Sequence, residues 1–211
     1  MNDNPSTTGA TDSSLSDISL SDYNSSLSAQ SIFRETMNAF AHPLQTYNIK
    51  EAASNNPLTQ GRNAIIMELC GIFLDNCVSF YVHNDTQLTA SLKELTYAIP
   101  SAIEIADFVI MENPDEFDKW ENISPGTLVD PHLGATVIIS VPQIAGDVSI
   151  TAQGPGIDGK ESFMLSHAIA ECIFKSRELD IEYPKGFDLL FVSQQGEICA
   201  LGRHVAIAAN A

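Results

Sequence analysis

The chain's clearest candidate for chemistry is a glycine-rich stretch, Q-G-P-G-I-D-G-K-E-S, at residues 153–162. From Gly154 to Lys160 it fits G-x-x-x-x-G-K, the start of a phosphate-binding P-loop. A working P-loop also needs a Ser or Thr after the lysine to hold Mg²⁺, and here that residue is Glu161. Glu161 and Asp158 would place two carboxylates against a triphosphate, so electrostatic repulsion opposes nucleotide binding. The glycines instead favour a tight turn between a strand and a helix.

No other spacing in the chain points to a catalytic group. Lys160 and Lys185 stand in polar, glycine-flanked turns, which favours solvated lysines over Schiff-base nucleophiles. The histidines show no H-x-x-H or H-x-x-x-H spacing, so no metal site is predicted, although one assembled from distant residues stays open. Asp75 ends an apolar helix and Asp188 heads an apolar strand; either could be functional, and capping roles are favoured. The G-x-S-x-G motif of many hydrolases is missing.

The composition excludes several classes of partner. The chain has 211 residues and a formal net charge of -17, from 27 acidic and 10 basic residues. Such a field repels nucleic acid and anionic membrane surfaces. No apolar run approaches the roughly 20 residues that cross a bilayer, and the N-terminus does not resemble a secretory signal. The four cysteines form no C-x-x-C pair, which favours buried free thiols in a cytoplasmic protein.

The chain divides into two compositional zones. Residues 1–29 are rich in serine and aspartate and contain no Lys or Arg, so they are predicted to be a disordered acidic tail. An ordered domain is predicted over residues 30–211. Apolar periodicity there predicts helices at 31–42, 63–75, 89–97 and 161–177, and strands at 77–82, 106–111, 134–141, 147–152, 187–192 and 197–201.

These elements position the candidate residues in an α/β fold. Helices alternate with strands without an internal repeat, which predicts a single domain with a mixed β-sheet flanked by helices. The last two strands are separated by S-Q-Q-G, which predicts a hairpin with Gly196 at a positive φ. The acidic segment 112–122 is predicted to be a surface helix or loop anchored by Trp120.

Four segments resemble one family in order and spacing. They are F-R-E-T-M-N-A-F-A-H-P (33–43), I-S-P-G-T-L-V-D-P-H-L-G-A-T-V-I-I (123–139), Q-G-P-G-I (153–157), and Y-P-K-G-F-D-L-L-F (183–191) with C-A-L-G-R (199–203). Together they resemble PhnH, a subunit of the bacterial carbon–phosphorus lyase system. Beside Asp75, the residues that become candidates for binding or structural roles are Phe33, Arg34, Pro43, Gly126, Gly134, Gly154, Pro155, Gly156, Gly186, Asp188 and Arg203.

The resemblance implies a fold and a set of partners. The family's fold is similar to the large domain of PLP-dependent transferases but lacks the cofactor-binding lysine, so no pyridoxal phosphate is expected. The resemblance also implies a homodimer that associates with PhnG, PhnI and PhnJ. PhnH is required with PhnG, PhnI and PhnL for the step in which a phosphonate displaces adenine from ATP, giving a ribose 1-phosphonate 5-triphosphate. No catalytic residue of the family can be carried over.

Departures from the family pattern keep two alternatives open. Leu44 stands where the family has a glycine, and Gly202, His204 and Val205 replace Pro, Thr and Thr around the retained Arg203. If that segment makes a contact in relatives, the contact is altered here. The chain could therefore be a divergent free-standing dimer, or a nucleotide-binding enzyme outside the complex.

Overall fold

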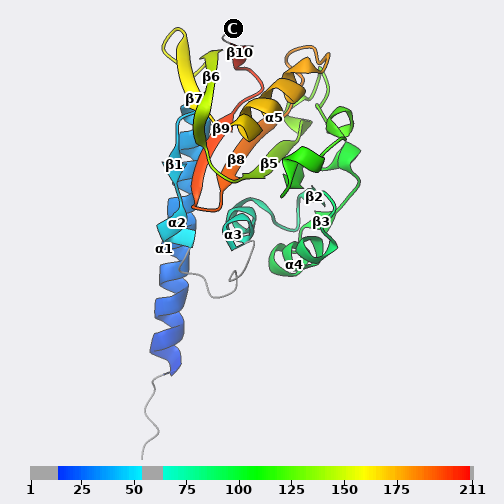
Figure 1. The fold of residues 1–211 in the computed structure, drawn as a ribbon. Coiled ribbons are helices and arrows are strands. Elements are labelled where there is room, and N and C mark those ends of the chain that lie inside the picture. Colours follow the sequence, from blue (N-terminus) through cyan, green and yellow to red (C-terminus); the bar gives the residue numbers. More distant parts are fainter. Residues whose placement is uncertain (1–13, 54–63, 210–211) are drawn as a thin grey trace, which may run out of the picture.

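The computed structural model describes residues 14–53 and 64–209, which form a seven-stranded sheet, a three-stranded sheet and the helices that cover them (Figure 1). The larger sheet has the order β1-β9-β8-β5-β4-β2-β3. Its strands β8, β5, β4, β2 and β3 are parallel to one another, whereas β9 and β1 run antiparallel to their neighbours. The predicted α/β fold with a mixed sheet and flanking helices is confirmed; the likeness to the large domain of PLP-dependent transferases stays a prediction.

The elements have the following bounds. The strands are β1 (Tyr47–Asn48), β2 (Ser79–Val82), β3 (Ile99–Pro100), β4 (Phe108–Met111), β5 (Thr136–Val141), β6 (Ala145–Gln153), β7 (Glu161–Leu165), β8 (Asp188–Ser193), β9 (Glu197–Leu201) and β10 (Ala206–Ala209). The α-helices are α1 (Ser14–Ala41), α2 (Lys50–Ala53), α3 (Ala64–Phe73), α4 (Thr86–Thr96) and α5 (His167–Glu178). Short 3-10 turns include η3 (Pro114–Glu116), η4 (Trp120–Asn122) and η5 (Pro131–Leu133).

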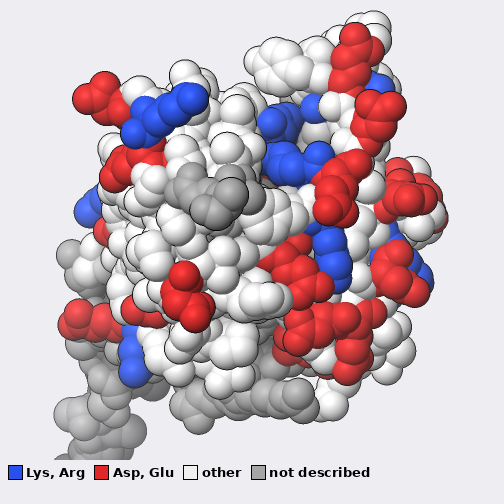
Figure 2. Space-filling model, turned by 45° about the horizontal axis from the view of Figure 1, so that its top comes forward, with Lys and Arg blue, Asp and Glu red and all other residues white. Residues whose placement is uncertain are grey.

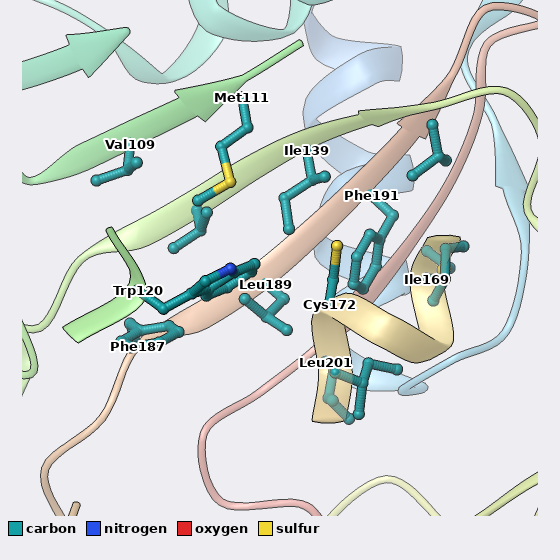
Figure 3. Close-up of a cluster of buried hydrophobic side chains, with 14 of the residues drawn as sticks. Val109, Met111, Trp120, Ile139, Ile169, Cys172, Phe187, Leu189, Phe191 and Leu201 are labelled. Atoms are coloured by element: carbon teal, nitrogen blue, oxygen red, sulfur yellow. The ribbon is translucent and has the colours of Figure 1, made fainter. Parts of the chain in front are cut away.

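The large sheet is buried on both faces, because successive side chains of a strand point to opposite sides. Along β8, Leu189 and Phe191 face α5, whereas Leu190 and Val192 face the layer of α1, α3 and α4. Figure 3 shows the α5 side, where Cys172 and Ile169 of the helix face Phe191 and Leu189. The other core contains Ile32, Leu69 and Leu92 from the three helices. The result is a sheet between two helical layers.

The predicted helix at 161–177 is wrong in its first part. Residues Glu161–Leu165 form β7, which pairs antiparallel with β6, and α5 begins only at His167. In β7 Leu165 is buried, while Ser162 and Met164 are exposed, a period-two pattern. The strand is too short for that pattern to outweigh the helical periodicity of the residues after it.

The first helix is longer than the sequence predicts. We expected it to start with Ser31 as its cap, but α1 begins at Ser14 and runs past the lower end of the sheet in Figure 1. Residues 14–29 therefore differ from the predicted disordered tail, and residues 1–13 lie outside the described residues. Extending a formed helix adds one hydrogen bond per residue and avoids a new nucleation step. The serine-rich residues 14–29 can therefore continue the helix toward its N-terminus from the part that packs in the core.

The other predicted helices and strands are present with shifted ends, whereas the sequence did not predict the short elements β1, α2, β3 and β10. The hairpin of β8 and β9 turns at Gly196, whose φ is +79°. Trp120 is buried and anchors the acidic segment between β4 and β5. No helix among the described residues is long and apolar enough to span a membrane.

Candidate functional site

An ion pair between Arg203 and Asp188 lies at the end of the large sheet where β8 begins and β9 ends. Asp188 starts β8 and Arg203 follows β9, and the antiparallel pairing of the two strands brings them together. Arg203 Nη2 lies 2.6 Å from Asp188 Oδ2, and the backbone N–H of Arg203 donates to Oδ1 at 2.7 Å. Their side chains are 15% and 23% exposed. Asp188, predicted as a cap, is instead the anionic partner of this pair.

Arg203 also holds the segment between Pro125 and Gly134. Its Nη1 donates to the Pro131 carbonyl and its Nη2 to the Gly134 carbonyl at 3.2 Å. From the other side, the Gly186 N–H donates to the Pro125 carbonyl at 2.8 Å. A side chain on Gly134 would collide with the Gly186 carbonyl and the Arg203 guanidinium. We call this arrangement the Arg203 clamp; it joins the motif at residues 123–139 to the motif at residues 183–191 and 199–203.

The clamp explains several residues that the sequence comparison singled out. Gly126 has a φ of +71°, and a Cβ there would lie 2.9 Å from the Pro131 carbonyl. Gly186 has a φ of +143°, with its Cβ position 3.0 Å from that of Arg203. Both positions therefore favour glycine for backbone conformation and for space. The structure brings together Gly126, Gly134, Gly186, Asp188 and Arg203.

The glycine-rich stretch packs against the end of α1. Gly156 has a φ of +83°, and a Cβ there would contact the Ala41 carbonyl and lie 2.7 Å from Pro43 Cδ. Gly154 has a φ of +158°, and its Cβ position is 3.1 Å from Val205 Cα. Together with the intervening Pro155, these glycines let the turn approach the first motif and the C-terminal segment closely.

This geometry does not form a P-loop. The stretch connects β6 to β7 within an antiparallel hairpin, so no helix N-terminus points toward a phosphate. The predicted turn between a strand and a helix is therefore a turn between two strands. Lys160 is exposed on the hairpin, and its neighbours Asp158 and Glu161 are exposed as well.

Three singled-out residues lie away from the Arg203 clamp. Phe33 is 47% exposed on α1, with its ring centroid 6.0 Å from that of Phe73. Arg34 is exposed on the same helix. Asp75 lies after the end of α3 and accepts a hydrogen bond from the Cys77 backbone N–H at 2.8 Å; its capping role stays a prediction.

The described residues contain no cluster of three or more His, Cys, Asp or Glu suited to a metal ion. Burial raises the pKa of Cys70, Cys172 and Cys199 to about 12, so these thiols are poor nucleophiles near neutral pH. The Arg203 guanidinium in the clamp is engaged with two backbone carbonyls and a carboxylate. The clamp is therefore suited to fixing the shape of a loop.

Arg177 is a polar residue that the sequence reasoning missed. From α5 its Nη2 donates to the Gly202 carbonyl at 3.0 Å, beside the clamp. Burial lowers its pKa, and the charge of Asp188 opposes that shift. One arginine in an amphipathic helix carries no signal that separates it from a solvated one.

Two shallow clefts lie between α5 and the acidic segment after β4. One, of about 610 Å³, has Phe117 and Trp120 among its lining residues, and the other, of about 290 Å³, borders Ile123 and Pro125. Both are also lined by Glu121 and Glu178. Figure 2 shows acidic side chains gathering over the right half of the molecule's upper face, the side on which Figure 1 places the green segment between β4 and β5.

Comparison with known proteins relates the chain to a family and to a named relative. The family described as "Bacterial phosphonate metabolism protein (PhnH)" matches residues 22–208. A protein of Stutzerimonas stutzeri named "Putative C-P lyase subunit protein HtxG" is 25% identical over 175 residues, which cover 82% of this chain and 83% of that protein. The family match includes every candidate residue named above.

Proposed function

Since the chain belongs to the PhnH family of bacterial phosphonate metabolism proteins, we propose that it acts as a subunit of a carbon–phosphorus lyase complex. The observation that carries the proposal is the family match over residues 22–208, within which residues of two distant motifs meet at the Arg203 clamp. The similarity to a protein named as a C-P lyase subunit supports the same assignment.

The proposed step is the formation of ribose 1-phosphonate 5-triphosphate from ATP and an alkylphosphonate. In this proposal the chain acts with PhnG, PhnI and PhnL, and PhnJ belongs to the same assembly. The chain supplies a shaped protein surface, and the groups that react with ATP belong to other subunits. The P-loop-like stretch supports this division of roles, because it lies in a β-hairpin and exposes two carboxylates beside its lysine.

The proposal also covers the fold to which the chain is related, its need for a cofactor, its oligomeric state and its place in the cell. The chain shares the architecture of the large domain of PLP-dependent transferases but works without pyridoxal phosphate. All of its lysines lie within the described residues, and each is exposed or half-buried, whereas a Schiff-base lysine needs a site that lowers its pKa. The protein is a cytoplasmic homodimer that joins the other lyase subunits.

Deleting the gene in its own host tests the role directly. We expect the deletion strain to stop growing when methylphosphonate is the sole phosphorus source and to grow normally on inorganic phosphate. The wild-type gene on a plasmid should restore growth on the phosphonate. Normal growth of the deletion strain on methylphosphonate, with the other lyase genes intact, would refute the proposed role.

A further inference from the structure

The loop between Pro125 and Gly134 presents three aliphatic side chains to solvent. Leu128 is 56% exposed, Val129 is 87% exposed and Leu133 is 51% exposed. They occur within six consecutive residues of one loop. Such a concentration of exposed aliphatic residues is typical of a surface that another protein covers.

The same loop is held in one shape before any partner arrives. The Thr127 N–H donates to the Asp130 carbonyl at 3.2 Å, and the Asp130 N–H returns a bond to Thr127 Oγ1 at 2.8 Å. The base of the loop is closed by a β-bridge between Pro125 and Gly134, and Arg203 fixes its second half. A loop ordered in advance loses little conformational entropy on binding.

An acidic surface adjoins this loop. Pro125, at the base of the loop, lines the smaller of the two clefts beside α5. The carboxylates that line the two clefts are those of Asp115, Glu116, Asp118, Glu121, Glu178 and Asp180. Lys175 is the one basic residue among the lining residues of these two clefts, and its ammonium group lies 2.7 Å from Glu171, so its charge is already paired.

From the exposed aliphatic side chains, the fixed loop and the adjoining carboxylates, we propose that the 125–134 loop and the acidic clefts form one docking surface for a different protein subunit. Its partner presents an apolar pocket for Leu128, Val129 and Leu133, and Lys or Arg side chains for the carboxylates. The charge pattern selects this partner: opposite charges across the rim favour encounter and orientation. This inference rests on the proposed function, because it places the contact within the lyase complex.

A second copy of the chain fits this surface poorly. A symmetric dimer through it would bring the same six carboxylates of each copy into proximity, in a chain whose formal net charge is already -17. Like charges across an interface oppose association. The homodimer contact therefore lies on another face.

Binding of the chain to a purified complex of co-expressed PhnG, PhnI and PhnJ from the same genome tests the surface. Leu128→Ser combined with Val129→Ser should weaken binding roughly tenfold or more, because central apolar contacts dominate interface energy. The matched control is Met164→Ser, which removes an exposed apolar side chain from β7 and should leave binding unchanged. Unchanged thermal midpoints establish that the variants fold.

A second pair of variants tests the charge. Glu121→Gln combined with Glu178→Gln should weaken binding several-fold and flatten its salt dependence. The control pair, Glu94→Gln with Asp158→Asn, removes two exposed carboxylates elsewhere and should have no effect.

The outcomes separate the two proposals. If the wild type binds and the loop and carboxylate variants bind equally well, the docking surface is wrong while the proposed function stands. If the loop variant keeps its affinity for the subunits but becomes monomeric, a second copy occupies the surface and the inference is overturned. If the wild-type chain does not bind the subunits, the proposed function fails, and the docking inference fails with it.

Discussion

Arg203 gives the 125–134 loop its fixed position, because one guanidinium binds a carboxylate and two backbone carbonyls at once. Lysine has a single ammonium group and cannot reproduce this planar set of donors. We expect Arg203→Lys to lower the free energy of unfolding by about 2 kcal/mol, since Asp188 and the carbonyls lose hydrogen bonds in a half-buried site. Urea unfolding measures the change.

The control for that substitution is Arg34→Lys, which changes an exposed arginine on α1 and should shift the unfolding midpoint little. Equal midpoints for Arg203→Lys and Arg34→Lys would show that the clamp contributes nothing to stability.

The cysteines make a second residue-scale prediction. Cys70, Cys172 and Cys199 are buried, and burial raises the pKa of each thiol to about 12, so their thiolate fraction at pH 8 is very small. Cys77 is exposed. Ellman's reagent at pH 8 should therefore modify one thiol in the native protein and all four after unfolding in urea. Rapid modification of two or more native thiols would contradict the burial of these side chains.

The β6–β7 hairpin is the element that connects the first motif to the C-terminal segment. Gly156 and Gly159 both have positive φ, of +83° and +71°, but only Gly156 lies against the end of α1. Gly159→Ala should cost about 1 kcal/mol from backbone strain. Gly156→Ala should cost at least about 2 kcal/mol, because its Cβ also meets the Ala41 carbonyl.

Thermal unfolding of the two variants against the wild type measures this difference. Similar losses at both glycines would mean that the hairpin does not depend on its contact with α1.

The elements that the sequence predicts best are those with one clear period. The strands around Val109, Ile138 and Leu190 are continuous apolar runs, and each lies inside the buried sheet. β7 was missed because its short alternating pattern runs into the helical periodicity of α5. β10 was missed because its alanines give little contrast between faces; it is defined by pairing with β6, a partner far away in sequence.

The sequence predicted which residues belong to the candidate site, but it did not predict that they lie in contact. The motif comparison named Gly134, Gly186, Asp188 and Arg203, but nothing in their spacing shows that they touch. Their contact depends on the pairing of β8 with β5 and β9, which brings residues 131–134 and 186–203 together. The same pairing places Asp188 beside Arg203, whereas the turn at Gly154 was misjudged because the strand after it, β7, was taken for the start of a helix.

At the scale of the whole molecule, the net charge of -17 makes the two proposed associations respond oppositely to salt. The homodimer must form against repulsion between like-charged copies, so it should weaken at low ionic strength. Docking to a basic subunit should weaken at high ionic strength. Light scattering of the isolated chain at tens of micromolar protein, across salt concentrations, tests the dimer. A monomer at every salt concentration would rule it out.

The most direct test of the central claim is reconstitution of the proposed step. Purified PhnG, PhnI and PhnL from the same genome are mixed with ATP and methylphosphonate, with and without this chain, and the release of adenine is measured. We predict that adenine and the ribose 1-phosphonate 5-triphosphate form only when the chain is present. Formation of both products at the same rate without the chain would contradict its role as a required subunit.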